Sequence, residues 1–180
     1  AQKDWEAWND YADLAGELTF DGLQGLMVNA WFESGEALGR FVVPAKEYRG
    51  RIPLSFQVLE SDYLDASKTG LVGEGGKPVV AGKEYDPATG RVLAYWLFPD
   101  HPGNLIGVAR KYTSTRVPAA DVVHLYRKTR PGQLRGVSEL AVGVMRFRDH
   151  GDYRDALLLK KKIEACFVGF VKGAQGQNAA

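Results

Sequence analysis

Apolar residues recur at helical spacing in the first part of the chain. Over residues 4–14 they lie three or four positions apart, which predicts a short amphipathic helix ended by Gly16. A second helix is expected over residues 20–32, with the Thr19 hydroxyl as N-cap and Gly35 as its stop. The apolar stripe of this second helix consists of Leu23, Leu26, Met27, Ala30 and Trp31.

The hydrophobic period then changes from about four to two, which is typical of strands. Alternation predicts strands at residues 37–43, 52–58, 78–85, 91–98 and 121–127, with a sixth candidate at 105–112. Residues 91–98 are apolar on both faces, so this strand is expected in the interior of a sheet. Residues 86–90 (Asp-Pro-Ala-Thr-Gly) have turn chemistry and separate two of the strands.

Beyond Gly136 the helical period returns. Ser138 is a suitable N-cap for a helix over residues 139–148. Gly151 interrupts the pattern, which predicts a second helix over residues 153–171.

The order of these elements indicates an α+β fold. It comprises N-terminal helices, a mixed or antiparallel sheet of five to six strands, and two C-terminal helices. We expect residues 1–150 to form one α+β domain, residues 151–172 a separate helix, and residues 173–180 a flexible tail.

The composition is that of a globular protein. Of the 180 residues 45% are hydrophobic and 25% charged, which argues against intrinsic disorder. No apolar run approaches the roughly 18 residues that span a bilayer, so no membrane partner is expected. The single Cys166 excludes an intramolecular disulfide and a Cys-rich zinc site, and its apolar neighbours predict a buried position. The chain begins at Ala1 and not at Met, so we expect a piece of a longer protein, folded in a reducing compartment.

Charge is distributed unevenly along the chain. Residues 1–105 contain 9 Lys and Arg against 16 Asp and Glu, a net charge of −7, whereas residues 106–180 contain 14 against 6, a net charge of +8. A basic half is compatible with contact to nucleic acid, or with packing against an acidic surface of the same chain or of a neighbouring subunit. We favour the second interpretation.

Candidate chemistry is sparse. The Gly-rich segment 73–78 lacks the spacing of a phosphate-binding loop and has Pro where Ser or Thr would bind magnesium, so an ordinary loop is expected. His101, His124 and His150 lie at no metal-ligand spacing, and no activated serine or cysteine motif occurs. We therefore expect no enzyme activity, no cofactor and no metal.

Two runs are distinctive. Residues 117–126 (VPAADVVHLY) and 130–140 (RPGQLRGVSEL) resemble the VPA-x-DV-x-H and RPGQ-x-RG-x-S-x-L runs of the lambda-type family of bacteriophage portal proteins. Segments 57–62, 90–96 and 162–170 also resemble that family, so the similarity covers nearly the whole chain.

The resemblance implies a structural subunit of a portal ring, usually dodecameric, at one capsid vertex of the virion. Such rings surround the channel for double-stranded DNA during packaging and ejection, and they contact terminase, head-completion or connector proteins, capsid and scaffold. Assembly would take place in the cytoplasm of a bacterial host. The first 150 residues would belong to the wing of the subunit and the last helix would lead into its stem. A small basic, non-enzymatic nucleic-acid-binding or regulatory module is the alternative, and a non-catalytic enzyme subunit is a more distant one.

Two sets of residues are candidates for contacts. The candidate DNA or subunit contacts are Arg127, Lys128, Arg130, Arg135, Lys160, Lys161 and Lys162. The lysine run is more basic than a portal channel wall, which leaves open whether it faces the channel. Leu158 and Val168 lie off the main apolar stripe of the last helix and are candidates for a subunit interface. Residues 130–136 are expected to be a structural joint, because Pro131 and two glycines favour a change of direction.

Overall fold

The computed structural model describes residues 2–43, 52–103 and 113–167. The candidate strand at 105–112, Val168 and the tail at 173–180 lie outside these residues. The chain divides into two compact units, Ala1–Glu139 and Leu140–Ala180, and each is described by itself.

The first unit contains two helices and seven strands among its described residues. The helices are α1 (Gln2–Asn9) and α2 (Phe20–Ser34). The strands are β1 (Glu36–Val42), β2 (Ser55–Leu59), β3 (Val79–Val80), β4 (Lys83–Tyr85), β5 (Val92–Leu97), β6 (Thr115–Pro118) and β7 (Val122–Tyr126). Short 3-10 segments lie at η1 (Ser61–Tyr63), η2 (Glu74–Gly76) and η3 (Ala119–Asp121). The α+β class is thus confirmed.

Helix α2 has the ends that its sequence predicts. The Thr19 side chain accepts a hydrogen bond from the backbone N–H of Gly22 at 3.3 Å. Gly35 has a φ of +87°, and its N–H donates to the Trp31 carbonyl at 2.7 Å. A residue with a Cβ resists this left-handed conformation, so glycine ends the helix and turns the chain into β1.

Helix α1 is shorter than predicted. It ends at Asn9, and the following residues instead run beside β2. The backbone N–H of Phe56 donates to the Ala12 carbonyl, and the Leu14 N–H donates to the Phe56 carbonyl. Backbone pairing along β2 therefore replaces the last turn of the expected helix.

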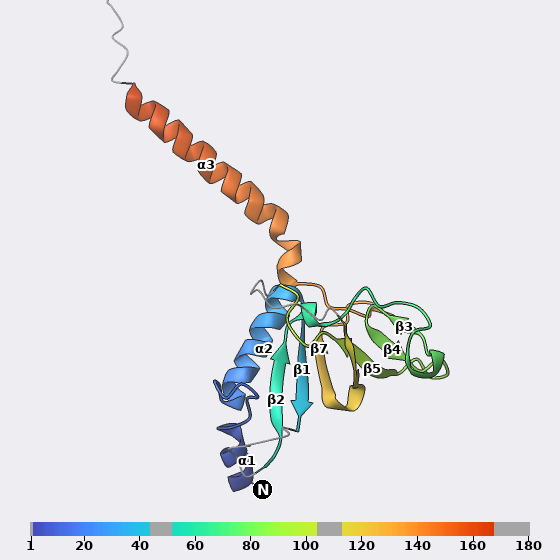
Figure 1. Cartoon of the computed structure of the whole chain (residues 1–180). Helices are drawn as coiled ribbons and strands as arrows, with labels where there is room; N and C mark the ends of the chain where they lie inside the picture. The colour runs from blue at the N-terminus through green and yellow to red at the C-terminus, as the bar shows by residue number, and fades with distance from the viewer. Residues whose placement is uncertain (1, 44–51, 104–112, 168–180) are drawn as a thin grey trace, which may run out of the picture. The chain divides into compact units, whose positions relative to one another are not determined.

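The strands form two antiparallel sheets where one was expected (Figure 1). The first has the order β2-β1-β7 and the second the order β3-β4-β5-β6. β5 lies between β4 and β6, which confirms the prediction of an interior strand. η3 carries the chain from β6 in one sheet to β7 in the other.

Side chains on the two faces of β1 enter two different cores. Ala37 packs with Leu23 and Met27 of α2, whereas Leu38 packs with Tyr95 and other residues of the second sheet. The first sheet therefore lies in the middle, with α2 on one face and the second sheet on the other. The inter-sheet core consists of Leu38, Leu59, Leu64, Tyr95, Leu97, Val117 and Val122.

Tight turns shape the second sheet. Residues 78–85, predicted as one strand, form a hairpin of β3 and β4. Ala81 and Gly82 turn it with φ values of +48° and +79°, as a two-residue hairpin requires. The turn at 86–90 is confirmed, because Asp86 accepts hydrogen bonds from the Ala88 N–H and the Thr89 hydroxyl.

The second unit corrects the prediction of two C-terminal helices. After the 3-10 segment η4 (Glu139–Val142), one continuous helix α3 runs over Val144–Cys166. Ser138 is therefore not its N-cap. Gly151 lies inside α3, because a single glycine costs only about 1 kcal/mol relative to alanine, which a helix of this length tolerates.

The position of Cys166 is also corrected. This residue was expected to be buried, but it is exposed, as is every described residue of α3 from its second turn to its end. The apolar pattern around Cys166 predicts a surface suited to packing, but it does not tell whether the same chain covers that surface. Among the described residues, no helix combines the length and the apolar character needed to cross a membrane.

Candidate functional site

The loop after β7 is organised by one buried amide. We call residues 127–136 the joint. The Gln133 side chain is 6% exposed, and its Nε2 donates to the carbonyls of Arg127 (3.3 Å) and Arg135 (2.8 Å). Its Oε1 accepts from the N–H (2.8 Å) and the hydroxyl (3.1 Å) of Thr129. Both amide donors and both acceptor positions are used, so the loop folds around its own side chain.

The end of the joint passes very close to the start of β1. A Cβ on Gly136 would lie 2.0 Å from the Gly35 carbonyl oxygen, and a Cβ on Gly35 would lie 2.1 Å from the Val137 carbonyl carbon. Both contacts are with backbone, which cannot move aside easily. Gly132, with a φ of +73°, supplies the left-handed turn of the loop. This geometry supports the expectation that residues 130–136 have a structural role.

The joint closes over a buried charge cluster, which consists of Glu36, Lys83, His124 and Arg135. One carboxylate oxygen of Glu36 binds the Arg135 guanidinium. The other lies 3.1 Å from Nε2 of His124 and accepts the Gly136 N–H at 2.8 Å. The Glu36 carboxylate is thus contacted from β7 and from the joint, and it ties both to the start of β1.

Glu36 is ionised in this cluster. Burial raises the pKa of its carboxyl, but the hydrogen bonds from His124, Arg135 and Gly136 outweigh burial and lower the pKa to about 2. Burial lowers the pKa of His124 despite the neighbouring carboxylate. The histidine is therefore neutral at pH 7.

Lys83 of β4 approaches the same cluster from the second sheet. It is 1% exposed, its Nζ donates to the Leu134 carbonyl, and the Nζ lies 4.7 Å from the centre of the Tyr126 ring. Burial lowers the pKa of Lys83 to about 8, and the nearby Glu36 carboxylate opposes this effect. Lys83 is therefore mostly charged at pH 7. Keeping this charge buried lowers the free energy of unfolding, because water no longer solvates it.

A second buried carboxylate neutralises another arginine. Glu84 is 0% exposed and receives two hydrogen bonds of 2.9 Å from Nε and Nη2 of Arg116. Glu74 adds a contact of 3.1 Å to the same guanidinium. Arg116 and Arg135, both from the basic half, are thus paired with carboxylates of the acidic half. Packing within the chain accounts for this part of the charge asymmetry.

The other predicted contact residues of the first unit are exposed. We call residues 127–130 the basic segment. Arg127 lies 3.5 Å from the Glu139 carboxylate, and the Lys128 Nζ lies 5.9 Å from the Tyr126 ring centre. Arg130 is exposed at the bend that precedes Pro131. Arg135, by contrast, faces inward to the buried charge cluster.

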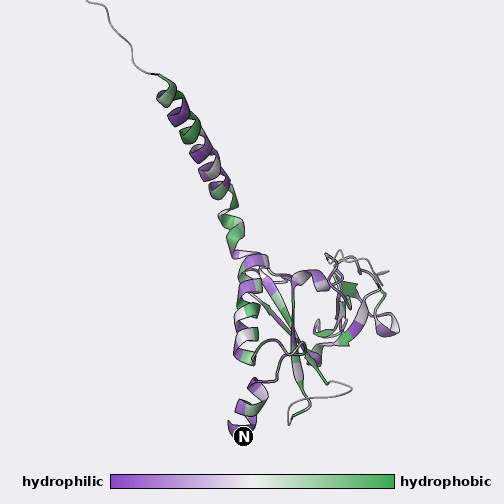
Figure 2. Cartoon of the chain, turned by 60° about the vertical axis from the view of Figure 1, so that its left-hand side comes forward, coloured by the Kyte–Doolittle hydropathy of each residue, from purple (hydrophilic) through white to green (hydrophobic). Residues whose placement is uncertain are grey.

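The predicted contact residues of the second unit lie on α3. Leu158 is 58% exposed. Lys160 and Lys161 lie 3.6 Å and 2.9 Å from the Glu164 carboxylate, and Lys162 is exposed. Figure 2 shows hydrophobic and hydrophilic segments alternating along this helix. The exposed large apolar side chains of α3 are Val144, Met145, Phe147, Tyr153, Leu157, Leu158, Leu159 and Ile163.

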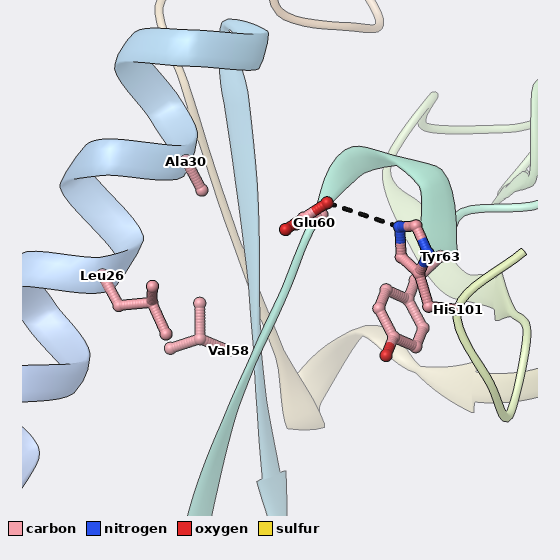
Figure 3. A pocket seen from close by; sticks show the side chains of 6 residues that line it. All are labelled: Leu26, Ala30, Val58, Glu60, Tyr63 and His101. Atoms are coloured by element: carbon pink, nitrogen blue, oxygen red, sulfur yellow. Dashed lines mark ion pairs between the residues drawn. The ribbon is translucent and has the colours of Figure 1, made fainter. Parts of the chain in front are cut away.

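An acidic pocket of about 260 Å³ opens between α2 and η1 (Figure 3). Leu26 and Ala30 of α2 and Val58 of β2 form its apolar wall. Glu60 and the aromatic rings of Tyr63 and His101 complete the lining, and the two rings meet edge to face at 5.3 Å.

The polar side of this pocket carries negative charge. Nε2 of His101 lies 3.3 Å from Glu60 and 3.9 Å from Asp62, and both carboxylate side chains are about two-thirds exposed (67% and 68%). The contact with Glu60 lies outside hydrogen-bond geometry, so its oxygens keep accepting capacity. Burial, with the charges of Glu60 and Asp100, raises the pKa of Tyr63.

Sequence reasoning missed the buried charge cluster. Lys83 lies inside the predicted strand 78–85, and a charge within a strand was the available signal, whereas Glu36 precedes the predicted strand 37–43 and gave no signal. His124, which stands at no metal-ligand spacing in the sequence, lies in this cluster. Segment 73–78 is a loop with the short 3-10 segment η2, as expected. Within the described ranges, no three His, Cys, Asp or Glu residues are grouped so that they could hold a metal ion.

Comparison with known proteins gives one family and one relative. The family model described as "Phage portal protein, lambda family" matches residues 1–180. The chain is 25% identical over 171 residues to a probable portal protein of Halomonas phage phiHAP-1. That alignment covers 94% of this chain but 32% of the relative, so the chain spans about a third of its length.

Proposed function

Because the chain belongs to the lambda family of phage portal proteins, we propose that it is part of a structural, non-enzymatic subunit of a portal ring at one vertex of the phage capsid. The match of the family model to all 180 residues carries this proposal. The ring, usually of twelve subunits, would surround the channel for double-stranded DNA and contact terminase, head-completion proteins, capsid and scaffold. It would be assembled in the host cytoplasm and remain in the virion.

The exposed apolar surface of α3 supports a role in assembly. No described residue of this helix is buried, yet eight large apolar side chains lie on it. Exposed apolar area of this extent usually marks a contact surface. We infer that α3 packs between the corresponding helices of two neighbouring subunits, with Leu158 in the contact. A head-to-tail contact of this kind closes into a ring by rotation.

Contact with DNA would be weak and independent of sequence. The basic segment is exposed, whereas Arg116 and Arg135 are neutralised by buried carboxylates. The lysine run at 160–162 is the other candidate for DNA contact, although Glu164 lies close to two of its members. Such contacts favour sliding of the duplex over recognition of its bases.

The test is assembly of the full-length protein, observed by negative-stain electron microscopy and native mass spectrometry. Leu158→Glu should abolish rings, because it places a charge in the subunit contact. The thermal midpoint of the 180-residue chain should remain within about 1 °C, since an exposed substitution changes stability by less than about 0.5 kcal/mol.

Arg146→Glu is the matched control. It also adds a glutamate to an exposed position of α3, about 120° around the helix from Leu158 at 3.6 residues per turn. Rings should form with this variant. Unfolding by Leu158→Glu would show that the helix is core, and a monomeric full-length protein that binds DNA with sequence preference at high salt would favour a nucleic-acid-binding module.

A further inference from the structure

The acidic pocket and the basic segment lie at opposite edges of one sheet. In the order β2-β1-β7, Glu60 directly follows β2 and the basic segment directly follows β7. Both strands are antiparallel to β1, with Leu59 opposite Leu38 and Tyr126 opposite Glu36. The two charged sites therefore emerge at the same end of the sheet, two strand spacings or about 10 Å apart.

The pocket has the chemistry to bind a long cationic side chain. Leu26 and Val58 offer an apolar wall for the methylene groups of such a side chain (Figure 3). Glu60 in the lining, with Asp62 beside His101, offers carboxylate oxygens to its charged end, and a planar guanidinium could bind Glu60 through two hydrogen bonds. The Tyr63 ring also lines the pocket and offers an aromatic surface to a guanidinium.

The basic segment supplies a cation that is available. Arg116 and Arg135 are held by buried carboxylates, and Arg127 lies beside Glu139. Arg130 is exposed, and no carboxylate of the described residues forms an ion pair with it. It stands at the bend that precedes Pro131.

Building on the proposed ring, we propose that the acidic pocket of one copy binds Arg130 of the next copy. The two sites are complementary in charge and follow the two outer strands of the sheet, so a neighbouring copy can approach each of them, and the resulting contact is head-to-tail and can repeat around a ring. Each subunit would then give one arginine to one neighbour and receive one from the other.

Charge reversal in the full-length protein tests this contact. Glu60→Arg and Arg130→Glu should each reduce the fraction of protein in rings by about tenfold or more, because like charges then meet at the contact. The double variant should restore assembly to within about twofold of the wild type. Glu17→Arg and Arg91→Glu, which reverse exposed charges elsewhere in the same unit, should assemble normally.

Cross-linking tests the contact directly. In a Cys166→Ser background, Glu60→Cys protein co-assembled with Arg130→Cys protein should give covalent dimers with a short bismaleimide, and either variant alone should not. Rings that tolerate both reversals and yield no covalent dimer would overturn the contact while leaving the proposed function intact. A wild-type full-length protein that forms no oligomer would refute the proposed function and the contact together.

Discussion

Replacing Glu36 with glutamine removes the negative charge from the buried charge cluster while keeping the shape of the side chain. The amide oxygen of Glu36→Gln can still accept the Gly136 N–H. The neutral amide cannot balance the charge of Arg135. Its NH₂ group would face the Arg135 guanidinium, so that two hydrogen-bond donors meet without an acceptor. The variant therefore tests whether the ionised carboxylate, and not merely the packing, fixes the joint to β1.

The expected loss of stability follows from the pKa of this carboxyl. A pKa lowered from 4.5 to about 2 corresponds to about 3 kcal/mol of stabilisation at pH 7. Breaking a buried ion pair by removing one partner typically costs a similar amount, about 3–5 kcal/mol. For a domain of this size the thermal midpoint should fall by roughly 6–12 °C.

The dependence on pH gives a sharper test. Because the pKa of Glu36 is lower in the folded than in the unfolded state, its stabilisation is complete above about pH 5 and lost as the pH falls toward 2. The wild type and Glu36→Gln should therefore differ most at pH 7 and converge near pH 2. Asp65 and Glu84 also have a lowered pKa, but they are present in both proteins and cancel in the difference.

Urea unfolding followed by tryptophan fluorescence at pH 7, 4 and 3 measures this difference. Glu74→Gln is the control, since it changes an exposed carboxylate 3.1 Å from Arg116 and should cost less than about 1 kcal/mol. Two results would contradict the role of the charge cluster in fixing the joint. One is a free energy of unfolding at pH 7 that Glu36→Gln lowers no more than the control does, and the other is a difference from the wild type that does not shrink with falling pH.

Three further outcomes are expected. Gly136→Val should prevent folding or lower the free energy of unfolding by more than about 3 kcal/mol, because the Cβ of the valine would meet the Gly35 carbonyl. Gly151→Ala, at an open position of α3, should instead raise the helicity measured by circular dichroism. Lys83→Met should stay within about 1 kcal/mol of the wild type at pH 7 or exceed it, since at this pH the cluster holds two cations, Lys83 and Arg135, against the one anion Glu36. A loss above about 2 kcal/mol in thermal unfolding would contradict this. Fluorescence anisotropy should show weak DNA binding that fades steeply between 50 and 200 mM salt, and base-specific binding at high salt would oppose it.

The sequence predicted the elements that local chemistry determines. Helix α2 has a hydroxyl at one end and a glycine at the other, and both act within a few residues of the helix. The turn at 86–90 is closed by the Asp86 side chain, and the interior place of β5 follows from its two apolar faces. Such signals need no knowledge of distant residues.

The features that the sequence did not predict depend on distant residues. Glu36 is buried with an arginine 99 positions away, and neither residue alone indicates the other. Residues 12–14 leave the expected helix because β2 offers them backbone hydrogen bonds. Cys166 was misjudged because the sequence pattern of α3 does not show how much of the helix its own chain covers, and Gly151 because the cost of one glycine is small for a helix of this length.

The distance along the chain between Glu36 and Arg135 also orders the events of folding. β1 pairs with β2 across a loop of about 12 residues between Val42 and Ser55, whereas the salt bridge closes a loop of 99, which costs about 2 kcal/mol more in chain entropy. We therefore expect α2, β1 and β2 to form an early hairpin-like unit, in which Glu36 stays hydrated until the joint arrives. During synthesis on a ribosome, the Glu36 carboxylate would stay without its partner until Arg135, 99 positions later, has been added to the chain. In pulse-labelled refolding, amides of β2 should then gain protection from hydrogen exchange before those of β7.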